Sequence, residues 1–275
     1  MYKNKNSTVL LIGGAGYVGS VVTQHLLEMG YAVRCFDNLI YNNHAAPESF
    51  LGHPNYDFQY GDLCDSNALE IAAEGVSHVV LLAGLVGDPI TKKYPDESDS
   101  INVDGVQDSF EILKGKGIKK LIFISTCSNY GLMEEGVLAN EESTLTPLSL
   151  YAKAKVAAEE KLISMKGEAD YCPTVLRFAT AFGLSPRMRF DLTVNEFTRE
   201  LAIGNELLVF DADTWRPYCH VRDFSRLIAK VLEEDPDKVA FEVFNAGGDE
   251  NNFTKRALVD EIVNLLPNSK VAYKE

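Results

Sequence analysis

The chain has 275 residues, of which 40 are acidic and 26 basic, so its formal net charge is −14 at pH 7. Such a charge argues against nucleic acid and anionic membrane surfaces as partners. The length suits one large domain or two unequal ones, and the 46% hydrophobic content is enough for a substantial core.

Short apolar runs alternate with amphipathic stretches over the first 178 residues. The expected strands are residues 8–12, 32–36, 57–60, 78–82, 121–125 and 174–178. The expected helices between them are residues 17–28, 66–73, 101–113 and 150–165. This alternation predicts an α/β fold with a parallel sheet that is covered by helices.

The pattern changes after residue 178. Loops lengthen, as in 183–192 and 210–218, and two more strands are expected at 206–210 and 242–245. We therefore expect residues 1–178 to form a dinucleotide-binding domain and residues 179–275 to form mostly a smaller substrate-binding lobe. A strand and a helix of this lobe would return to the first domain. The lobe would cover the carboxyl edge of the sheet, where open α/β sheets bind ligands.

A glycine-rich turn lies between the first strand and the first helix. Gly13, Gly16 and Gly19 permit a tight turn and a close approach of the backbone to a pyrophosphate at the helix N-terminus. Such glycines alone also fit an ordinary strand-to-helix turn. Asp37 at the end of the second strand adds a carboxylate that accepts both ribose hydroxyls and repels a 2′-phosphate, which favours NAD over NADP.

Two more strand ends fit the same dinucleotide. After the third strand, Asp62 is placed to reach the adenine amino group, and small residues end the fourth strand beside the cofactor. The candidate cofactor-binding residues are Gly13, Gly16, Tyr17, Val18, Gly19, Asp37, Asn38, Asp62, Leu63, Leu82, Ala83, Gly84 and Lys155.

Tyr151 and Lys155 are four residues apart in a strongly helical segment, so they share one face of the helix. A neighbouring ammonium lowers the pKa of a phenol, which allows Tyr151 to exchange a proton with a sugar hydroxyl while Lys155 also holds the nicotinamide ribose. An exposed helix pair is the alternative. The glycine-rich turn and the polar end of the fifth strand, about 25 residues earlier, favour an active site.

These motifs resemble the extended short-chain dehydrogenases/reductases, and more narrowly their NAD-dependent nucleotide-sugar epimerase/dehydratase branch. The resemblance covers the whole chain, and residues 101–105 match a structural helix of that family. It implies a Rossmann-type doubly wound sheet with a smaller C-terminal substrate-binding lobe, bound NAD and a homodimer through a four-helix bundle. Ile12 stands where the family often has Thr, and we expect a C-terminal substrate-contacting piece to be absent or shorter, because relatives commonly continue beyond Glu275.

By the same resemblance, Thr126 is the hydroxyl of the catalytic triad, four residues before Tyr130. Sugar 4,6-dehydratases have Asp-Glu at the next two positions, where this chain has Cys127 and Ser128. Enzymes that epimerise carbons three and five commonly have Cys at the position of Ser128. Both reactions are therefore disfavoured, and we expect Cys127 to pack beneath the site.

The chemistry that remains takes place at a single carbinol, expected at carbon four. Tyr151 takes the hydroxyl proton, a hydride passes to NAD⁺, Thr126 bonds the reacting oxygen and Lys155 stabilises the tyrosinate. A 4-epimerase, a 4-dehydrogenase and a 4-ketoreductase all stay open. A non-catalytic NAD-binding sensor is disfavoured because the triad is complete, and an NADP-dependent ketoreductase of uncharged substrates is disfavoured by Asp37 and the arginines.

Arginines gather in the C-terminal part, where a guanidinium can bind a diphosphate with two hydrogen bonds. Arg216 matches the diphosphate-binding position of the family. The sequences of residues 82–89, 183–198 and 218–223 most resemble a sub-branch that includes GDP-D-glycero-D-manno-heptose 4-dehydrogenase of bacterial surface-polysaccharide pathways. The candidate substrate-binding residues are Ser128, Thr180, Arg187, Arg189, Leu192, Asn195 and Arg216.

The five cysteines are scattered singly, with no Cys-x-x-Cys pair. An odd, dispersed set fits a reducing compartment better than a disulfide scaffold or a zinc site. No long apolar segment is present. The sequence therefore predicts a cytoplasmic protein with no signal peptide, membrane span or metal site.

Overall fold

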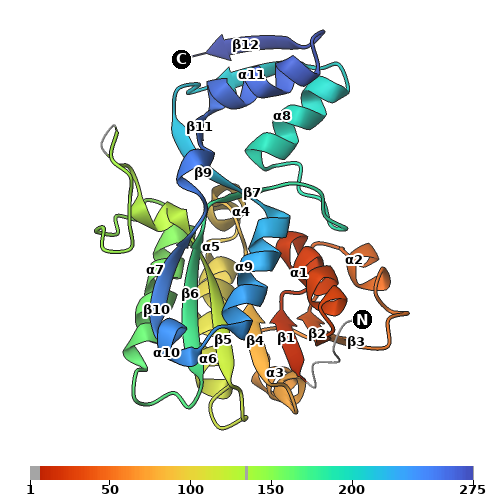
Figure 1. The fold of residues 1–275 in the computed structure, drawn as a ribbon, viewed down its shortest axis with the longest axis vertical. Helices are drawn as coiled ribbons and strands as arrows, with labels where there is room; N and C mark the ends of the chain where they lie inside the picture. Colours follow the sequence, from red (N-terminus) through yellow and green to blue (C-terminus); the bar gives the residue numbers. More distant parts are fainter. Residues whose placement is uncertain (1–6, 134–135, 275) are drawn as a thin grey trace.

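The computed structural model describes residues 7–133 and 136–274 (Figure 1). Its centre is a seven-stranded sheet in which every pair of neighbouring strands is parallel. The strands are β1 (Thr8–Ile12), β2 (Ala32–Asp37), β3 (Tyr56–Tyr60), β4 (His78–Leu81), β5 (Lys120–Thr126), β6 (Cys172–Phe178) and β10 (Glu242–Ala246). Their order is β10-β6-β5-β4-β1-β2-β3, which is the Rossmann-type doubly wound sheet that the sequence predicts.

The strand order reverses beside β1. The chain runs from β1 outward through β2 and β3, then crosses back to β4 and continues outward through β5 and β6. The crevice at such a switch point, at the carboxyl ends of the strands, is where open α/β sheets bind their ligands. This topology places the loops after β1, β2, β4 and β5 around one space.

Helices cover both faces of the sheet (Figure 1). The helices of this part of the chain include α1 (Tyr17–Glu28), α2 (Ala45–Glu48), α3 (Ser66–Ala73), α4 (Asp88–Lys93), α5 (Pro95–Asp99), α6 (Val106–Ile112), the 3₁₀ turn η2 (Cys127–Tyr130), α7 (Leu150–Ser164), α9 (Val221–Glu233) and α10 (Pro236–Val239). One face carries α1 packed against α9, and the other carries α3, α6 and α7 in sequence.

Each face of the sheet has its own apolar core. Because successive strand residues point to opposite faces, Val9 and Leu11 lie in one core while Leu10 and Ile12 lie in the other. The two cores explain why the central strands read as unbroken apolar runs.

The helix expected over residues 101–113 divides into two elements. Its first part is a π-helix, η1 (Ser100–Gly105), and α6 follows directly. Within η1 the side chain of Asn102 is buried and bonded to the backbone of Leu85. The wider turn of the π-helix thus occurs where the side chain of Asn102 is hydrogen-bonded to the loop after β4.

The C-terminal part adds two small sheets beyond the carboxyl edge of the main one (Figure 1). Its elements are β7 (Thr180–Phe182), α8 (Thr193–Ala202), β8 (Glu206–Phe210), β9 (Trp215–His220), η3 (Asp249–Asn251), β11 (Asn252–Thr254), α11 (Lys255–Leu265) and β12 (Lys270–Lys274). A separate core between α8, α11 and β8 includes Phe197, Val209 and Val259. β9 begins inside a segment that the sequence suggested to be a loop, while α9 and β10 return to the main sheet.

Within the ranges that the structure describes, no helix is both long and apolar enough to cross a bilayer. In the same ranges, no group of three or more His, Cys, Asp or Glu side chains is arranged to hold a metal ion.

Candidate active site

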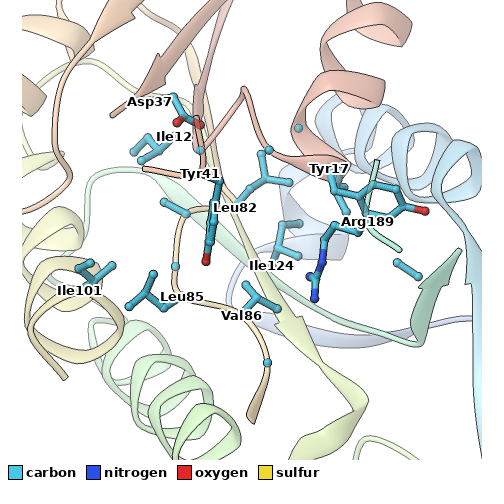
Figure 2. A pocket seen from close by; sticks show the side chains of 18 of the residues that line it. Ile12, Tyr17, Asp37, Tyr41, Leu82, Leu85, Val86, Ile101, Ile124 and Arg189 are labelled. Carbon is cyan, nitrogen blue, oxygen red and sulfur yellow. The ribbon is translucent and has the colours of Figure 1, made fainter. Parts of the chain in front are cut away.

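A cavity of about 550 Å³ lies at the carboxyl ends of the central strands (Figure 2). Its walls come from the glycine-rich turn, the ends of β2, β4 and β5, the first turns of α7, and the loop of residues 183–192. Every predicted site residue lines this cavity except Asn195 and Arg216. One cavity therefore joins the predicted cofactor-binding residues to the predicted catalytic residues.

The turn before α1 is too crowded for side chains. A Cβ atom on Gly19 would lie 2.5 Å from the carbonyl oxygen of Gly13, and one on Gly13, where φ is +84°, would lie 2.7 Å from the amide nitrogen of Ala83. The N-terminus of α1 has no side-chain cap on Gly16, so its first amides are left for a ligand. The turn fits the pyrophosphate of a dinucleotide.

Asp37 is held at the end of β2 by two backbone amides. Its Oδ2 accepts from the amide of Ala15 at 3.0 Å, and its Oδ1 accepts from the amide of Leu39 at 2.8 Å. Burial raises the pKa of Asp37, and these amides together with the charge of Arg187 oppose that rise. The carboxylate faces the cavity (Figure 2), where its remaining lone pairs fit ribose hydroxyls.

The loops after β3 and β4 complete the dinucleotide side of the cavity. Asp62 accepts from Asn38 Nδ2 at 2.8 Å and from the amide of Cys64 at 2.8 Å, which ties together the loops after β2 and β3. Asn102 Oδ1 accepts from the amide of Leu85 at 2.8 Å, and its Nδ2 donates to the carbonyl of Leu85 at 2.9 Å. These side chains shape the walls by holding the backbone.

Thr126, Tyr151 and Lys155 meet at the other end of the cavity. Thr126 is the last residue of β5, and its Oγ1 accepts from the amide of Ser128 at 3.1 Å, so the hydroxyl is left to donate. Tyr151 and Lys155 lie in the first turns of α7, which is capped by Ser149. Lys155 Nζ donates to the carbonyl of Ile124 at 2.8 Å and lies 5.9 Å from the centre of the Tyr151 ring.

Burial governs the titration of this pair. It lowers the pKa of Lys155 to about 8, and the charge of Glu159 opposes this fall. It raises the pKa of Tyr151, an effect that Cys127 reinforces and Arg189 opposes. We expected Lys155 to lower the pKa of Tyr151, but desolvation dominates, and the cation that acts on the phenol is Arg189. At neutral pH the phenol is protonated and able to donate.

The loop of residues 183–192 closes the cavity over the glycine-rich turn. Tyr17 Oη donates to the carbonyl of Gly183 at 2.6 Å, and Ser185 Oγ donates to the carbonyl of Tyr17 at 2.7 Å. Arg189 is paired with Asp191 and projects into the cavity (Figure 2). The guanidinium of Arg187 lies 4.8 Å from the ring centre of Tyr41.

Asn195 and Arg216 lie outside the cavity wall. Asn195 is buried, and its amide donates to Tyr17 Oη at 3.0 Å and to the carbonyl of Arg189 at 2.9 Å, so its hydrogen bonds hold the loop. Arg216 is exposed on β9, and its charge lowers the pKa of the Cys127 thiol against the effect of burial. Arg216 is therefore within electrostatic range of Cys127, in the turn that follows Thr126.

Several residues that line or support the cavity were not identified from the sequence. Tyr41 and Asn43, from the loop after β2, line the cavity, and Asn43 Nδ2 donates to the carbonyl of Ala15 at 2.6 Å. Their positions, four and six residues after Asp37, could have indicated that they lie in the same loop beside the cavity. Glu159 lies one helical turn beyond Lys155 and is buried beneath the site. Its spacing of four residues from Lys155 could have indicated that the two side chains share one face of α7.

The position after the triad hydroxyl carries no acid. Ser128 lines the cavity and Cys127 is half-buried beside it, so neither residue after Thr126 supplies a carboxylate. The acidic residues that line the cavity are Asp37, Asp62 and Asp191, and all three are bonded to amides or to an arginine. The arrangement suits proton exchange through Tyr151 at one hydroxyl.

Residues 9–247 match the model of the NAD dependent epimerase/dehydratase family. Among curated proteins, the chain is 28% identical over 271 residues to UDP-glucose 4-epimerase 1 of Oryza sativa subsp. japonica, covering 87% of this chain and 75% of that protein. It is 32% identical over 195 residues to UDP-arabinose 4-epimerase 1 of Arabidopsis thaliana, covering 66% of this chain and 44% of that protein. The chain thus spans less than half of the second relative.

Among solved structures, the chain is similar to the UDP-glucose 4-epimerase of Thermus thermophilus in complex with NAD. The two share 25% identity with a TM-score of 0.82, over 97% of this chain and 86% of that chain. The similarity extends over both the main sheet and the C-terminal part.

Proposed function

This chain belongs to the NAD-dependent epimerase/dehydratase family, and from that premise we propose that it interconverts UDP-sugars that differ in configuration at carbon four. It is an enzyme of the extended short-chain dehydrogenase/reductase type, and its cofactor is NAD. One observation carries the proposal. Thr126, Tyr151 and Lys155 line the same cavity as Asp37, while Cys127 and Ser128 provide no carboxylate for dehydration.

The glycine-rich turn, Asp37 and Lys155 would hold the dinucleotide. The amides before α1 suit its pyrophosphate, Asp37 suits the ribose near the adenine, and Lys155 suits the ribose near the nicotinamide. When bound, NAD supplies a hydride acceptor and donor for the carbon that bears the reacting hydroxyl.

Tyr151 handles the proton in this proposal. The phenol first gives up its own proton; as the phenolate, its Oη then takes the proton of the sugar hydroxyl when the carbon is oxidised, and as the phenol it returns that proton when the carbon is reduced from the other face. The charge of Arg189, which projects into the cavity, favours the deprotonated state of the phenol, and the Lys155 ammonium lies 5.9 Å from the centre of its ring. Thr126 donates a hydrogen bond to the same sugar oxygen, because its own oxygen is already bonded to the amide of Ser128.

The C-terminal lobe, residues 179–275, would bind the nucleotide. Arg187 and Arg189 line the cavity and Arg216 lies close to Cys127, so the arginines suit the diphosphate. Thr180 and Leu192 complete the wall with Ser128, and Asn195 holds the loop. We favour uridine because the rice and Arabidopsis relatives are UDP-sugar 4-epimerases. A GDP-heptose 4-dehydrogenase or a 4-ketoreductase for surface polysaccharides is the alternative.

Product analysis tests this proposal. The purified protein is incubated with UDP-glucose, UDP-galactose, UDP-arabinose, UDP-xylose and GDP-D-glycero-D-manno-heptose, and the products are separated and weighed by mass spectrometry. A 4-epimerase gives an isomer of unchanged mass from a UDP-sugar. Loss of two hydrogens would indicate a dehydrogenase, and loss of water would overturn the interpretation of Cys127 and Ser128.

We also propose a homodimer in the cytoplasm. α6 and α7 pack against each other on one face of the sheet, and two copies of this pair would form a four-helix bundle. Light scattering during size-exclusion chromatography should give about twice the mass of one chain. A mass equal to the 30.4 kDa of the chain would contradict the dimer.

A further inference from the structure

A buried ion pair that the reaction above does not use lies directly beneath the catalytic residues. Glu159 of α7 is 3% exposed and Arg177 of β6 is 6% exposed. Arg177 Nη2 donates to Glu159 Oε2 at 2.7 Å, and its Nε donates to the same oxygen at 3.0 Å. Removing two charges from water is costly, and apolar residues of similar size often stabilise a core at least as well. The pair is therefore expected to do more than stabilise the fold.

The carboxylate binds the two ends of the turn that carries Thr126. Asn129 Nδ2 donates to Glu159 Oε1 at 2.7 Å, and Ser125 Oγ donates to the same oxygen. Asn129 Nδ2 is also 3.1 Å from Ser125 Oγ. Ser125 directly precedes Thr126 on β5, and Asn129 lies in the 3₁₀ turn that follows it. One oxygen atom thus fixes the backbone on both sides of the triad hydroxyl.

Arg177 extends the network from β6 to β10, an edge strand of the central sheet. Its Nη1 donates to Tyr130 Oη at 3.0 Å, and Tyr130 Oη donates to Asn245 Oδ1 at 2.6 Å. The ion pair therefore connects α7 and the 3₁₀ turn after β5 to β6 and β10. The groups on β6 and β10 are rigidly placed, because both strands are paired in the central sheet.

The same carboxylate acts on Lys155. The two residues are one turn apart on α7, and the charge of Glu159 raises the pKa of Lys155 against the lowering effect of burial. The other groups facing Lys155 are Tyr151 on its own helix, and the carbonyl of Ile124 and the ring of Phe123 on β5. None of these others carries a negative charge at neutral pH. Glu159 is thus the anion that favours the ammonium form.

We propose that Glu159, paired with Arg177, is a positioning residue. It holds the end of β5, which carries Thr126 and the Ile124 carbonyl that accepts from Lys155, in the geometry required for proton exchange at Tyr151. The inference rests on the proposed function for its effect on turnover, but its effect on Lys155 is measurable without any substrate. Glu159 touches neither the cavity nor the reacting atoms. Arg177 orients it through its Nε and Nη2 hydrogen bonds.

Glu159→Gln in the full chain tests this role. The variant keeps the size of the side chain and removes its charge. We expect kcat for the UDP-sugar to fall about 10- to 100-fold, since small misplacements of catalytic groups have effects of this size, with KM and bound NAD unchanged. The alkaline limb of the pH–rate profile should move to lower pH, because the variant loses the anion that favours protonated Lys155. NMR of ¹³C-labelled lysines should show the same downward change in the pKa of Lys155.

Two further variants separate positioning from folding. Glu159→Gln combined with Arg177→Met removes both charges, so no guanidinium is left buried alone; circular dichroism should show a folded protein, and turnover should stay low. Glu111→Gln removes a more exposed carboxylate of α6 that is paired with Lys161 of α7, and should leave turnover and the Lys155 titration unchanged.

Wild-type turnover and an unchanged Lys155 titration in a folded Glu159→Gln variant would overturn the inference. The proposed function fails separately, if the wild-type protein transforms no nucleotide sugar. In that case the NMR titration still decides whether Glu159 acts on Lys155.

Discussion

Tyr151 is half-buried among groups that favour opposite protonation states. Desolvation and Cys127 favour the phenol, while Arg189 favours the phenolate. Lys155 carries a pKa of about 8, so it is mostly an ammonium at neutral pH and loses its charge on the alkaline side. The proposed oxidation of a carbinol needs proton exchange at Tyr151, beside a Lys155 that is still charged at neutral pH.

Replacement of Tyr151 by Phe removes the proton-exchanging oxygen and leaves the ring in place. We expect kcat to fall about 10²- to 10⁴-fold, while bound NAD, measured by absorbance after denaturation, stays at the wild-type level. Tyr60→Phe is the control, because Tyr60 is 72% exposed and does not line the cavity. Turnover near the wild-type rate in Tyr151→Phe would mean that another group exchanges the proton.

Asp37 is expected to set the choice of dinucleotide. Replacement by Ala removes the carboxylate that accepts ribose hydroxyls and repels a 2′-phosphate, so the preference for NAD over NADP should diminish. Arg187 lies close enough to influence the pKa of Asp37, and it would then be free to attract a phosphate. Dissociation constants of both dinucleotides measured by calorimetry test this, and an unchanged ratio would contradict it.

Among individual residues, those that belong to motifs with fixed spacing could be predicted from the sequence as site residues. Asp37, Thr126, Tyr151 and Lys155 line one cavity, as expected for a shared site. Arg177 could not be predicted as part of the site. Its partner Glu159 is 18 positions away, and nothing in the local sequence pattern shows that the two are buried together. Burial also reversed the expected direction of the Tyr151 pKa, since a sequence does not show how much solvent a side chain loses.

The π-helix η1 holds the loop after β4 in place. It turns Asn102 inward, where three hydrogen bonds join it to both backbone groups of Leu85 and to Ser98 Oγ at 3.1 Å. Leu85 belongs to the loop that lines the cavity after β4. The wider helical turn therefore fixes a wall of the cofactor site through one side chain.

Asn102→Ala should loosen that wall. The buried backbone groups of Leu85 lose their partners, which we expect to lower the free energy of unfolding by about 2–3 kcal/mol and to weaken NAD binding. Asn251→Ala, at an exposed position, should change the free energy of unfolding by less than about 0.5 kcal/mol. Urea unfolding followed by circular dichroism provides both values. Equal stability of the two variants would show that Asn102 does not hold the loop.

The strands of the central sheet were predictable to within two residues. Both of its faces are buried, so its strands are continuous apolar runs bounded by polar residues. The short strands β7, β9 and β11 were not predicted. They have three to six residues and are partly exposed, so their composition matches that of a loop, and pairing with distant strands makes them extended.

At the scale of the whole molecule, the cavity depends on two distant parts of the chain. The sheet supplies the dinucleotide side, and the loop of residues 183–192 closes it through Tyr17, Ser185 and Asn195. The sequence predicted that the C-terminal part would cover the carboxyl edge of the sheet. It did not predict that Asn195 and Tyr17 would join the two parts, because their contact spans 178 positions.

Oxidation and reduction at a single carbon is tested most directly by following the hydrogen on carbon four of the sugar. The wild-type protein is given UDP-glucose with deuterium on carbon four in ordinary water, and the products are examined by NMR and mass spectrometry. We predict UDP-galactose that keeps the deuterium on carbon four, with no change in mass. A product that has lost water, or a product whose deuterium has been replaced by hydrogen from solvent, would contradict the account.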